Sequence, residues 1–351
     1  MTSFSICIPN YNYEKYVEQT VRSALDHPET GQVIFNDNAS TDRSVEIVRA
    51  IADPRLEVRV NRWNVGFAGN LDLACQGATG DRIVLLSSDD LLNPGALGAY
   101  ARLADALGDK ADRAVFDATA DVIDGDGVRT GSVEMNRKLW HGARLDADLS
   151  RAVGGDVWRI DAATLLRNSV LLLRSPFQFA STCYSRGLFD SVEGFHAVRL
   201  SGPDKFLNWK LLAVADEAFH VDLPLVSYRW HNQNQFSVQT SQRSLRHMTD
   251  QYVSTFDTPP EILARAKVDN ATLAAAFIEQ DVALRGLKLL AEGRRDEAQR
   301  GVWLGYAAYP HLARRNRKVR LLQGLLAMGP VGGFAARKAL DRAMRRWQQP
   351  G

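Results

Sequence analysis

Two adjacent carboxylates, Asp89 and Asp90, end an apolar run that predicts a buried strand over residues 83–87. Ligands of open α/β sheets bind at the carboxyl ends of the strands, so these side chains are expected at the mouth of a site. Two hard oxygen ligands suit Mg²⁺ or Mn²⁺, which in such sites also binds a phosphate group. A loop whose Asp residues cap the next helix fits this stretch equally well.

The elements that would position these carboxylates alternate along the first part of the chain. Short apolar runs predict strands, and segments with apolar residues at helical spacing predict helices between them. Such alternation indicates βαβ units, so we predict an α/β fold with a mostly parallel sheet flanked by helices. The expected strands are residues 4–8, 32–35, 56–60 and 83–87, and the expected helices are 13–26, 45–51 and 70–77.

The composition of the 351 residues is that of an ordinary globular protein, with 45% hydrophobic and 24% charged residues. The net charge of +2 gives no general attraction to nucleic acid. Cys7, Cys75 and Cys183 lie far apart, which excludes a zinc motif of the CxxC type and indicates a reducing compartment. We expect no signal peptide and no membrane-spanning helix, and hence a cytoplasmic protein.

Several nucleotide-binding schemes are excluded by the turn after the first strand. Residues 9–12 read Pro-Asn-Tyr-Asn, where a Rossmann site would have its Gly-x-Gly-x-x-Gly turn. The chain also has no Gly-x-x-x-x-Gly-Lys phosphate loop and no glycine-rich loop of the sugar-nucleotide pyrophosphorylase kind. A nucleotide would have to be held in another way.

Polar segments follow successive predicted strands, and their order resembles that of family 2 glycosyltransferases with the GT-A fold. Each segment is short, but all lie at strand ends or in adjoining loops. The segments are 9–12 (Pro-Asn-Tyr-Asn), 37–42 (Asp-Asn-Ala-Ser-Thr-Asp), 64–66 (Asn-Val-Gly) with Asn70, 78–81 (Ala-Thr-Gly-Asp) and 87–90 (Ser-Ser-Asp-Asp).

This resemblance implies a role for each segment. The turn at 9–11 and the polar residues at 37–38 would cradle the base of a nucleoside diphosphate, with Tyr11 able to stack on it. Asp89 and Asp90 would contact the ribose and a divalent metal, Mn²⁺ or Mg²⁺, on the diphosphate. The implied nucleotide-sugar-binding residues are Pro9, Tyr11, Asp37, Asn38, Asn64, Asn70, Ser88, Asp89 and Arg229, and the implied metal ligands are Asp89, Asp90 and His231.

Two positions depart from the pattern of the family. Ser87 stands where many relatives have a third carboxylate, which leaves open which of Asp89 and Asp90 holds the metal. Pro203 replaces a Glu, but the following Asp204 is retained, and the resemblance makes Asp204 the general base. An Asp in the first turn of a helix is also favoured by the helix dipole alone.

The segment Tyr228-Arg229-Trp230-His231 resembles the closing element of the family. His231 would bind the diphosphate or complete the metal shell, and Arg229 would neutralise phosphate charge. The amide-rich residues 232–237 suggest a lid over the donor. A lone His is, however, most often simply hydrogen-bonded within the fold.

We expect a GT-A-like catalytic domain at 1–240, with a nucleotide-binding half at about 1–110 and an acceptor-binding half at about 111–240. Residues 241–351 should form a helical extension. Five of the seven residues 314–320 are basic. This tail fits a contact with anionic lipid on the inner membrane surface, and equally well a helix that packs on the catalytic domain or on a dimer partner.

The resemblance implies an inverting glycosyltransferase of the hexosyltransferase type. The donor would be a UDP- or dTDP-sugar, and the acceptor a hydroxyl group of a saccharide or lipid-linked saccharide in bacterial surface glycan synthesis. Two alternatives stay open. The first is a catalytically silent nucleotide-sugar-binding or scaffold protein, which the departures at Ser87 and Pro203 would fit. A metal-dependent phosphatase or nucleotidyltransferase could also use Asp89 and Asp90, although its motifs are missing.

Overall fold

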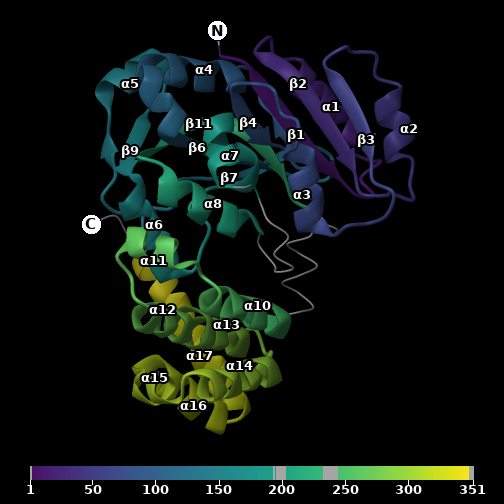
Figure 1. Ribbon diagram of the computed structural model, residues 1–351. Coiled ribbons are helices and arrows are strands. Elements are labelled where there is room, and N and C mark those ends of the chain that lie inside the picture. Colours follow the sequence, from purple (N-terminus) through teal and green to yellow (C-terminus); the bar gives the residue numbers. More distant parts are fainter. Residues whose placement is uncertain (1, 193, 195–202, 232–243, 348–351) are drawn as a thin grey trace. The chain divides into compact units, whose positions relative to one another are not determined.

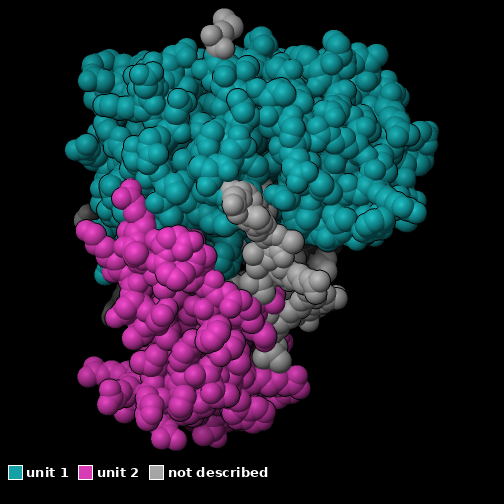
Figure 2. All heavy atoms as spheres, in the orientation of Figure 1, with its two compact units in different colours: residues 1–169, 174–231 teal, residues 170–173, 232–351 magenta. Residues whose placement is uncertain are grey.

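The computed structural model describes residues 2–192, 194, 203–231 and 244–347 (Figure 1). The chain divides into two compact units (Figure 2). Unit 1 comprises Met1–Ser169 and Arg174–His231, and unit 2 comprises Val170–Leu173 and Asn232–Gly351. The predicted lid at 232–237 lies outside the described residues.

The first half of the sheet in unit 1 is parallel, with the strand order β3-β2-β1-β4. It arises from the alternating pattern of the sequence, because each helix returns the chain to the same end of the sheet. The strands are β1 (Phe4–Asn10), β2 (Thr30–Asp37), β3 (Leu56–Val60) and β4 (Arg82–Leu85), and the helices between them are α1 (Val17–Leu25), α2 (Ser44–Arg49) and α3 (Phe67–Cys75).

The second half of the sheet is mixed. Only β6 and β11 pair in parallel there, and the remaining ladders of this half are antiparallel. The prediction of an α/β sheet flanked by helices is thus confirmed, but its parallel character is confined largely to the first half. The strands are β5 (Leu91–Leu92), β6 (Ala114–Ile123), β7 (Arg129–Val133), β8 (Arg144–Leu145), β9 (Val157–Asp161), β10 (Cys183–Ser185) and β11 (Glu217–Arg229).

Further helices of this unit connect and cover these strands (Figure 1). The last of them, α8, buries Phe206, Trp209 and Leu212 and begins beside Asp204. The helices are α4 (Ala96–Leu107), η1 (Gly108–Arg113), α5 (Ala147–Val153), α6 (Ala162–Leu172), η2 (Phe179–Ser181), α7 (Arg186–Ser191) and α8 (Pro203–Val214).

Burial explains the strand pattern. Every residue of β1 is buried, as expected for a central parallel strand covered on both faces. β3 is the outer strand and only partly buried, which matches its alternation of apolar and charged residues. Gly80 lies so close to β1 that a Cβ atom would meet the Ser5 backbone nitrogen at 2.6 Å. The segment 78–81 therefore seats β4 against β1.

Unit 2 is helical within the part of the chain that is described. Its small core contains Leu289, Val302, Leu322 and Leu326. None of the described helices is both long enough and apolar enough to cross a membrane. The helices are α10 (Ser244–Phe256), α11 (Pro260–Ala266), α12 (Asn270–Phe277), the π-helix η3 (Ile278–Leu284), α13 (Arg285–Ala291), α14 (Arg295–Ala308), α15 (Pro310–Arg315), α16 (Arg317–Ala327) and α17 (Pro330–Trp347).

Candidate functional site

The polar segments singled out in the sequence gather at one edge of the parallel half-sheet. β1 ends at Asn10, β2 ends at Asp37, and the carboxylate pair follows β4. Because these strands are parallel neighbours, their carboxyl ends meet at the same edge. The fold thus brings together segments that lie far apart in the sequence.

Asp37 holds the loops at this edge together. It is fully buried, and its carboxylate accepts hydrogen bonds from Asn10 Nδ2 at 2.8 Å, from the Ser40 backbone N–H at 2.8 Å and from Ser40 Oγ at 2.6 Å. Asn10 Oδ1 is buried and has no hydrogen-bond partner among the described residues. A buried acceptor without a partner is costly, so a donor group of a ligand would be favoured there.

Asn38 organises the loop after β3. Its Oδ1 accepts from the Val65 backbone N–H at 2.9 Å and from Asn61 Nδ2 at 3.1 Å, and its Nδ2 donates to Asn64 Oδ1 at 3.0 Å. Asn64 is exposed and also accepts from the Gly66 backbone N–H at 2.8 Å. Asn64 is therefore placed where a ligand can reach it, whereas Asn38 mainly shapes the loop.

Asn70 lies beneath the surface, in α3. Its Oδ1 accepts from Asn36 Nδ2 at 2.7 Å and from Asn61 Nδ2 at 3.0 Å, and its Nδ2 donates to the carbonyl oxygens of Asn10 and Asn36 at 3.3 and 3.2 Å. This amide already makes the four hydrogen bonds that such a side chain commonly supplies. The geometry gives Asn70 a role in joining α3 to the strand ends.

Replacing Asn70 by Ala is expected to destabilise the protein by about 1–3 kcal/mol, because the amides of Asn36 and Asn61 would lose a buried acceptor. Thermal unfolding measures this as a lower Tm. The exposed Asn64 serves as the control, and Asn64→Ala should change the Tm much less. An unchanged Tm combined with weaker nucleotide binding would instead mean that Asn70 contacts the ligand directly.

Tyr11 and Ser88 flank the end of β1. Ser88 is buried, and its Oγ donates to the Pro9 carbonyl oxygen at 2.8 Å, which ties the carboxylate segment to β1. The Tyr11 side chain is 40% exposed, so its ring is accessible for stacking. Ser40 Oγ accepts from the backbone N–H of Asn12 at 2.9 Å and fixes the turn that carries Tyr11.

Asp89 meets His231 at this edge. The distance from Asp89 Oδ2 to His231 Nε2 is 3.0 Å, and both side chains are largely buried. The His231 ring lies 5.0 Å from the ring of Tyr16 and 6.1 Å from that of Tyr13, measured between centroids. The structure thus joins two of the three predicted metal ligands, which are 142 residues apart in the sequence.

Asp90 has a different partner, the backbone of β11. Its Oδ1 accepts from the Arg229 backbone N–H at 2.8 Å, and the residue is 1% exposed. Burial and the neighbouring Asp89 raise the pKa of the Asp90 carboxyl, while hydrogen bonds from Arg229 and Ser87 oppose the shift. Asp90 therefore secures the motif to β11, and Asp89 is the carboxylate that meets His231.

Arg229 is buried under the motif with a relative exposure of 1%. Its Nε donates to the Asp89 carbonyl oxygen at 2.8 Å, its Nη1 to the Asp124 carbonyl oxygen at 3.2 Å, and its Nη2 to Gln19 Oε1 at 3.0 Å. The guanidinium also lies 4.7 Å from the centre of the Tyr16 ring. Arg229 therefore stabilises the position of the carboxylate segment, residues 87–90, through the Asp89 backbone.

Three tyrosines without a predicted site role, Tyr13, Tyr16 and Tyr228, border Asp89, Asp90 or His231. Burial raises the pKa values of the Tyr13 and Tyr228 hydroxyls, and the two carboxylates raise them further. A possible signal was the position of Tyr13 and Tyr16 directly after the first strand-end turn. Tyr228 belongs to the closing element, in which only Arg229 and His231 were predicted as site residues.

Asp204 lies in the first turn of α8 and is partly exposed. Burial raises the pKa of its carboxyl group, and hydrogen bonds from the backbone N–H groups of Lys205 and Asp204 oppose this effect. These contacts are local to the helix start, and within the described residues they do not join Asp204 to Asp89 or His231. The preceding residues 195–202 lie outside the described part of the chain.

The described residues contain no cluster of three or more His, Cys, Asp or Glu side chains that could hold a metal ion. Asp89 and His231 form a pair only. A carboxylate oxygen and an imidazole nitrogen suit a divalent ion that takes its other ligands from phosphate oxygens and water. The pair therefore fits a metal that arrives with a diphosphate.

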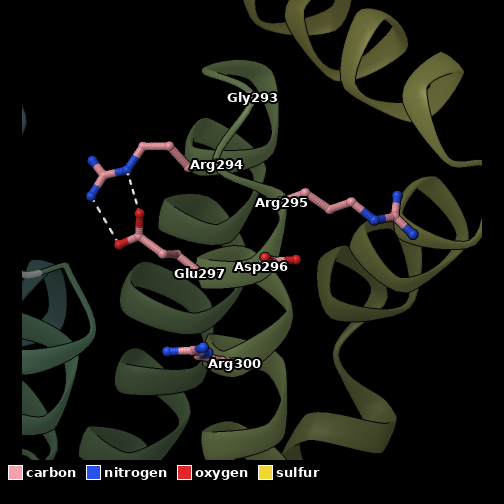
Figure 3. Close-up of a pocket in the computed structure, with 6 residues that line it drawn as sticks. All are labelled: Gly293, Arg294, Arg295, Asp296, Glu297 and Arg300. Atoms are coloured by element: carbon pink, nitrogen blue, oxygen red, sulfur yellow. Dashed lines mark hydrogen bonds and ion pairs between the residues drawn. The ribbon is translucent and has the colours of Figure 1, made fainter.

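A separate pocket of about 350 Å³ lies in unit 2 at the start of α14 (Figure 3). Arg294 pairs with Glu297 there, at 2.6 Å between Nε and Oε1, and Arg295 points to the other side of the helix. Arg294 and Glu297 neutralise each other in this pocket, so neither charge is available for a ligand without breaking their ion pair. It carries none of the residues singled out in the sequence.

Comparison with known proteins gives a match of residues 5–150 to the model of glycosyl transferase family 2. A glycosyltransferase of Haemophilus influenzae is 35% identical over 95 residues, which are 26% of this chain and 38% of that protein. The poly(ribitol-phosphate) beta-N-acetylglucosaminyltransferase TarS of Staphylococcus aureus is 30% identical over 111 residues, 30% of this chain and 19% of TarS. The matched segments thus span well under half of these relatives.

A third relative is the UDP-Glc:alpha-D-GlcNAc-diphosphoundecaprenol beta-1,3-glucosyltransferase WfaP of Escherichia coli, 35% identical over 91 residues, 26% of this chain and 36% of WfaP. Among solved structures, residues 1–349 of S. aureus TarS in complex with UDP-GlcNAc superpose with a TM-score of 0.61. The identity is 18%, and the alignment covers 99% of this chain and 93% of that one. The likeness establishes a shared fold.

Proposed function

We propose, from the match of residues 5–150 to glycosyl transferase family 2, that the chain is an inverting glycosyltransferase. It transfers a sugar from a nucleoside-diphosphate sugar to a hydroxyl group of a saccharide or lipid-linked saccharide. The observation that carries the proposal is the meeting of the strand-end motifs with the Asp89–His231 pair at one edge of the sheet.

The donor is proposed to be a UDP-sugar, with dTDP as the alternative base. Support comes from the relatives, since WfaP is named for UDP-Glc and TarS has been solved with UDP-GlcNAc. In this chain, the exposed ring of Tyr11 would stack on the base. The exposed Asn64 is a polar group that a base or ribose could reach.

Members of the family generally use a divalent metal. Asp89 and His231 are the residues that would hold it, whereas Asp90 is engaged with the backbone of β11. When bound, such an ion neutralises the charge that develops on the diphosphate leaving group. Arg229 supports this function indirectly, because its guanidinium fixes the Asp89 backbone and so the direction of the carboxylate.

Asp204 is proposed as the general base. It would take the proton from the acceptor hydroxyl while that oxygen attacks the anomeric carbon. The bond from the anomeric carbon to the diphosphate breaks in the same step, and the nucleoside diphosphate leaves. A single displacement inverts the anomeric configuration and needs no covalent enzyme intermediate.

The acceptor is proposed to belong to a bacterial surface glycan. The names of two relatives support this acceptor class. TarS is named for poly(ribitol-phosphate), and WfaP for a diphosphoundecaprenol-linked sugar. A cytoplasmic location, expected from the use of cysteine, is part of the same proposal.

Calorimetric titration of the full chain with nucleoside diphosphates, with and without Mn²⁺, tests the proposal. We expect one pyrimidine diphosphate to bind, and to bind more tightly when Mn²⁺ is present. Absence of binding by every nucleotide would overturn the proposed donor site. Tight binding of a UDP-sugar without turnover on any saccharide acceptor would favour the silent binding or scaffold protein, for which Ser87 and Pro203 are the motivating substitutions.

A further inference from the structure

The helical unit 2 contains a long segment of one charge sign. Residues 298–340 include no Asp or Glu but eight Lys or Arg residues, although the whole chain has a net charge of only +2. Lys318 pairs with Glu279, and the other basic residues leave this segment with an excess of positive charge that favours an anionic partner. The basic residues are Arg300, Arg314, Arg315, Arg317, Lys318, Arg320, Arg337 and Lys338.

α16, within this segment, has one buried and one exposed face. Val319, Leu322 and Leu326 are buried and hold the helix in the core of unit 2. On the opposite side, Leu321 and Met328 are 53% and 52% exposed. They share this face with the exposed Arg317, since steps of four and seven residues return to the same side of a helix.

α17 repeats the arrangement. Ala336 is buried, whereas Val331 and Phe334 are 61% and 69% exposed. Lys338 lies on the same side as these two residues, again at helical spacing, and is exposed. An exposed Phe and an exposed Val one turn apart are unusual at the surface of a helix that already has a buried face.

The exposed apolar residues flank the turn between the two helices. α16 ends at Ala327 and α17 begins at Pro330, and the Gly332 backbone N–H donates to the Gly329 carbonyl oxygen at 3.2 Å. Met328 and Val331 therefore lie at the tip of a helical hairpin. The basic residues Arg317 and Lys338 lie further along the two helices, away from the turn.

We infer that this hairpin, defined by Leu321, Met328, Val331 and Phe334 with the surrounding basic residues, docks on an anionic lipid surface. An apolar tip enters the boundary between headgroups and acyl chains, and a collar of Lys and Arg meets the negative headgroups. The inference concerns unit 2 alone and does not depend on the proposed transferase activity.

The combination of positive charge and exposed apolar side chains favours a lipid surface over a second copy of the chain or a nucleic acid. A second copy of the same face would bring two basic surfaces together without an acidic residue of the segment to compensate them. Nucleic acid would use the cations but leave the exposed apolar residues without a favourable contact. A lipid surface satisfies both kinds of side chain, because it offers negative charge above an apolar layer.

Co-sedimentation of the full chain with lipid vesicles tests the inference. We expect binding to vesicles of equal parts phosphatidylglycerol and phosphatidylcholine, and little binding to pure phosphatidylcholine. The double variant Arg317→Gln with Arg320→Gln should bind the anionic vesicles about 25-fold more weakly, because each basic residue near the surface contributes about fivefold. Met328→Gln with Phe334→Gln should weaken binding about tenfold.

Matched controls come from exposed residues elsewhere in the chain. Phe256→Gln removes a side chain that is 74% exposed at the end of α10, and Arg22→Gln with Arg43→Gln removes two exposed charges of unit 1. Both should bind vesicles like the natural chain. Equal binding to both vesicle types, no binding, equal losses in the controls, or a dimer in solution that Phe334→Gln abolishes would each overturn the inference.

Discussion

Turnover is expected to fall by about two to four powers of ten when Asp204 is replaced by Asn, the usual effect of losing a general base. Asn is nearly isosteric and can still accept the backbone hydrogen bonds of the first turn of α8, so the helix should form as before. Donor affinity should not change, because proton removal from the acceptor is not needed for donor binding. Steady-state kinetics and calorimetry with the donor measure the two effects separately.

The pH dependence gives a second signature of Asp204. A general base works in its deprotonated form, and burial raises the pKa of this carboxyl. Activity should therefore decline on the acid side at a pH above the usual range for Asp, and this decline should be missing from the residual activity of Asp204→Asn. A profile that is the same in both proteins would remove Asp204 from the role.

The Tm of Asp204→Asn distinguishes the loss of a general base from damage to the fold. The folded-state pKa of Asp204 lies above its unfolded value, so the carboxylate costs stability at every pH above the unfolded pKa. Removing the charge should leave the Tm equal or higher at neutral pH. Asp269→Asn is the matched control, since Asp269 also begins a helix and accepts from the Thr272 backbone N–H at 2.7 Å. Equal losses of turnover in both variants would indicate a role in helix capping only.

The second large effect is expected at Asp89. Asp89→Asn should weaken the Mn²⁺-dependent part of donor binding by about 10–100-fold or more, because a charged metal ligand contributes at least as much as the groups that orient it. Asp90→Asn should keep most of the metal dependence, since an Asn can still accept the hydrogen bond from the Arg229 backbone. Calorimetry with and without Mn²⁺, together with electron paramagnetic resonance of the bound ion, measures this without reference to turnover.

His231 provides the check on this assignment. His231→Gln should reduce Mn²⁺ binding in the same direction as Asp89→Asn, because the two side chains lie 3.0 Å apart. The opposite pattern, with Asp90→Asn losing the metal and Asp89→Asn retaining it, would reverse the roles of the two carboxylates. Unchanged metal-dependent affinity in both Asp variants would remove the metal from this edge of the sheet.

Local patterns in the sequence were enough to predict the parallel half of the sheet. β3 begins and ends at the predicted residues, 56 and 60, and its alternating pattern identified it as the outer strand. The polar segments after β1, β2 and β4 were identified as a site because a parallel sheet collects strand ends at one edge. A helical extension was also expected at residues 241–351, and the described residues 244–347 contain helices.

The second half of the sheet could not be predicted in this way. β10 has only three residues, and its antiparallel pairing with β4 and β6 depends on contacts between segments about 70 to 100 residues apart. Short strands carry too little periodicity to show their direction. The prediction of a mostly parallel sheet therefore describes the first half better than the whole.

The sequence by itself determined which chemistry is present: carboxylates, amides and an aromatic residue at strand ends, and a basic helical tail. Only the tertiary structure decided which of these groups are buried and which partners they contact. Asp89 meets His231, whereas the adjacent Asp90 bonds to the backbone of Arg229. Arg229 and Asn70 turn inward because long-range hydrogen bonds satisfy them there. Neighbours in sequence thus have different partners, and only contacts between distant segments determine these partners.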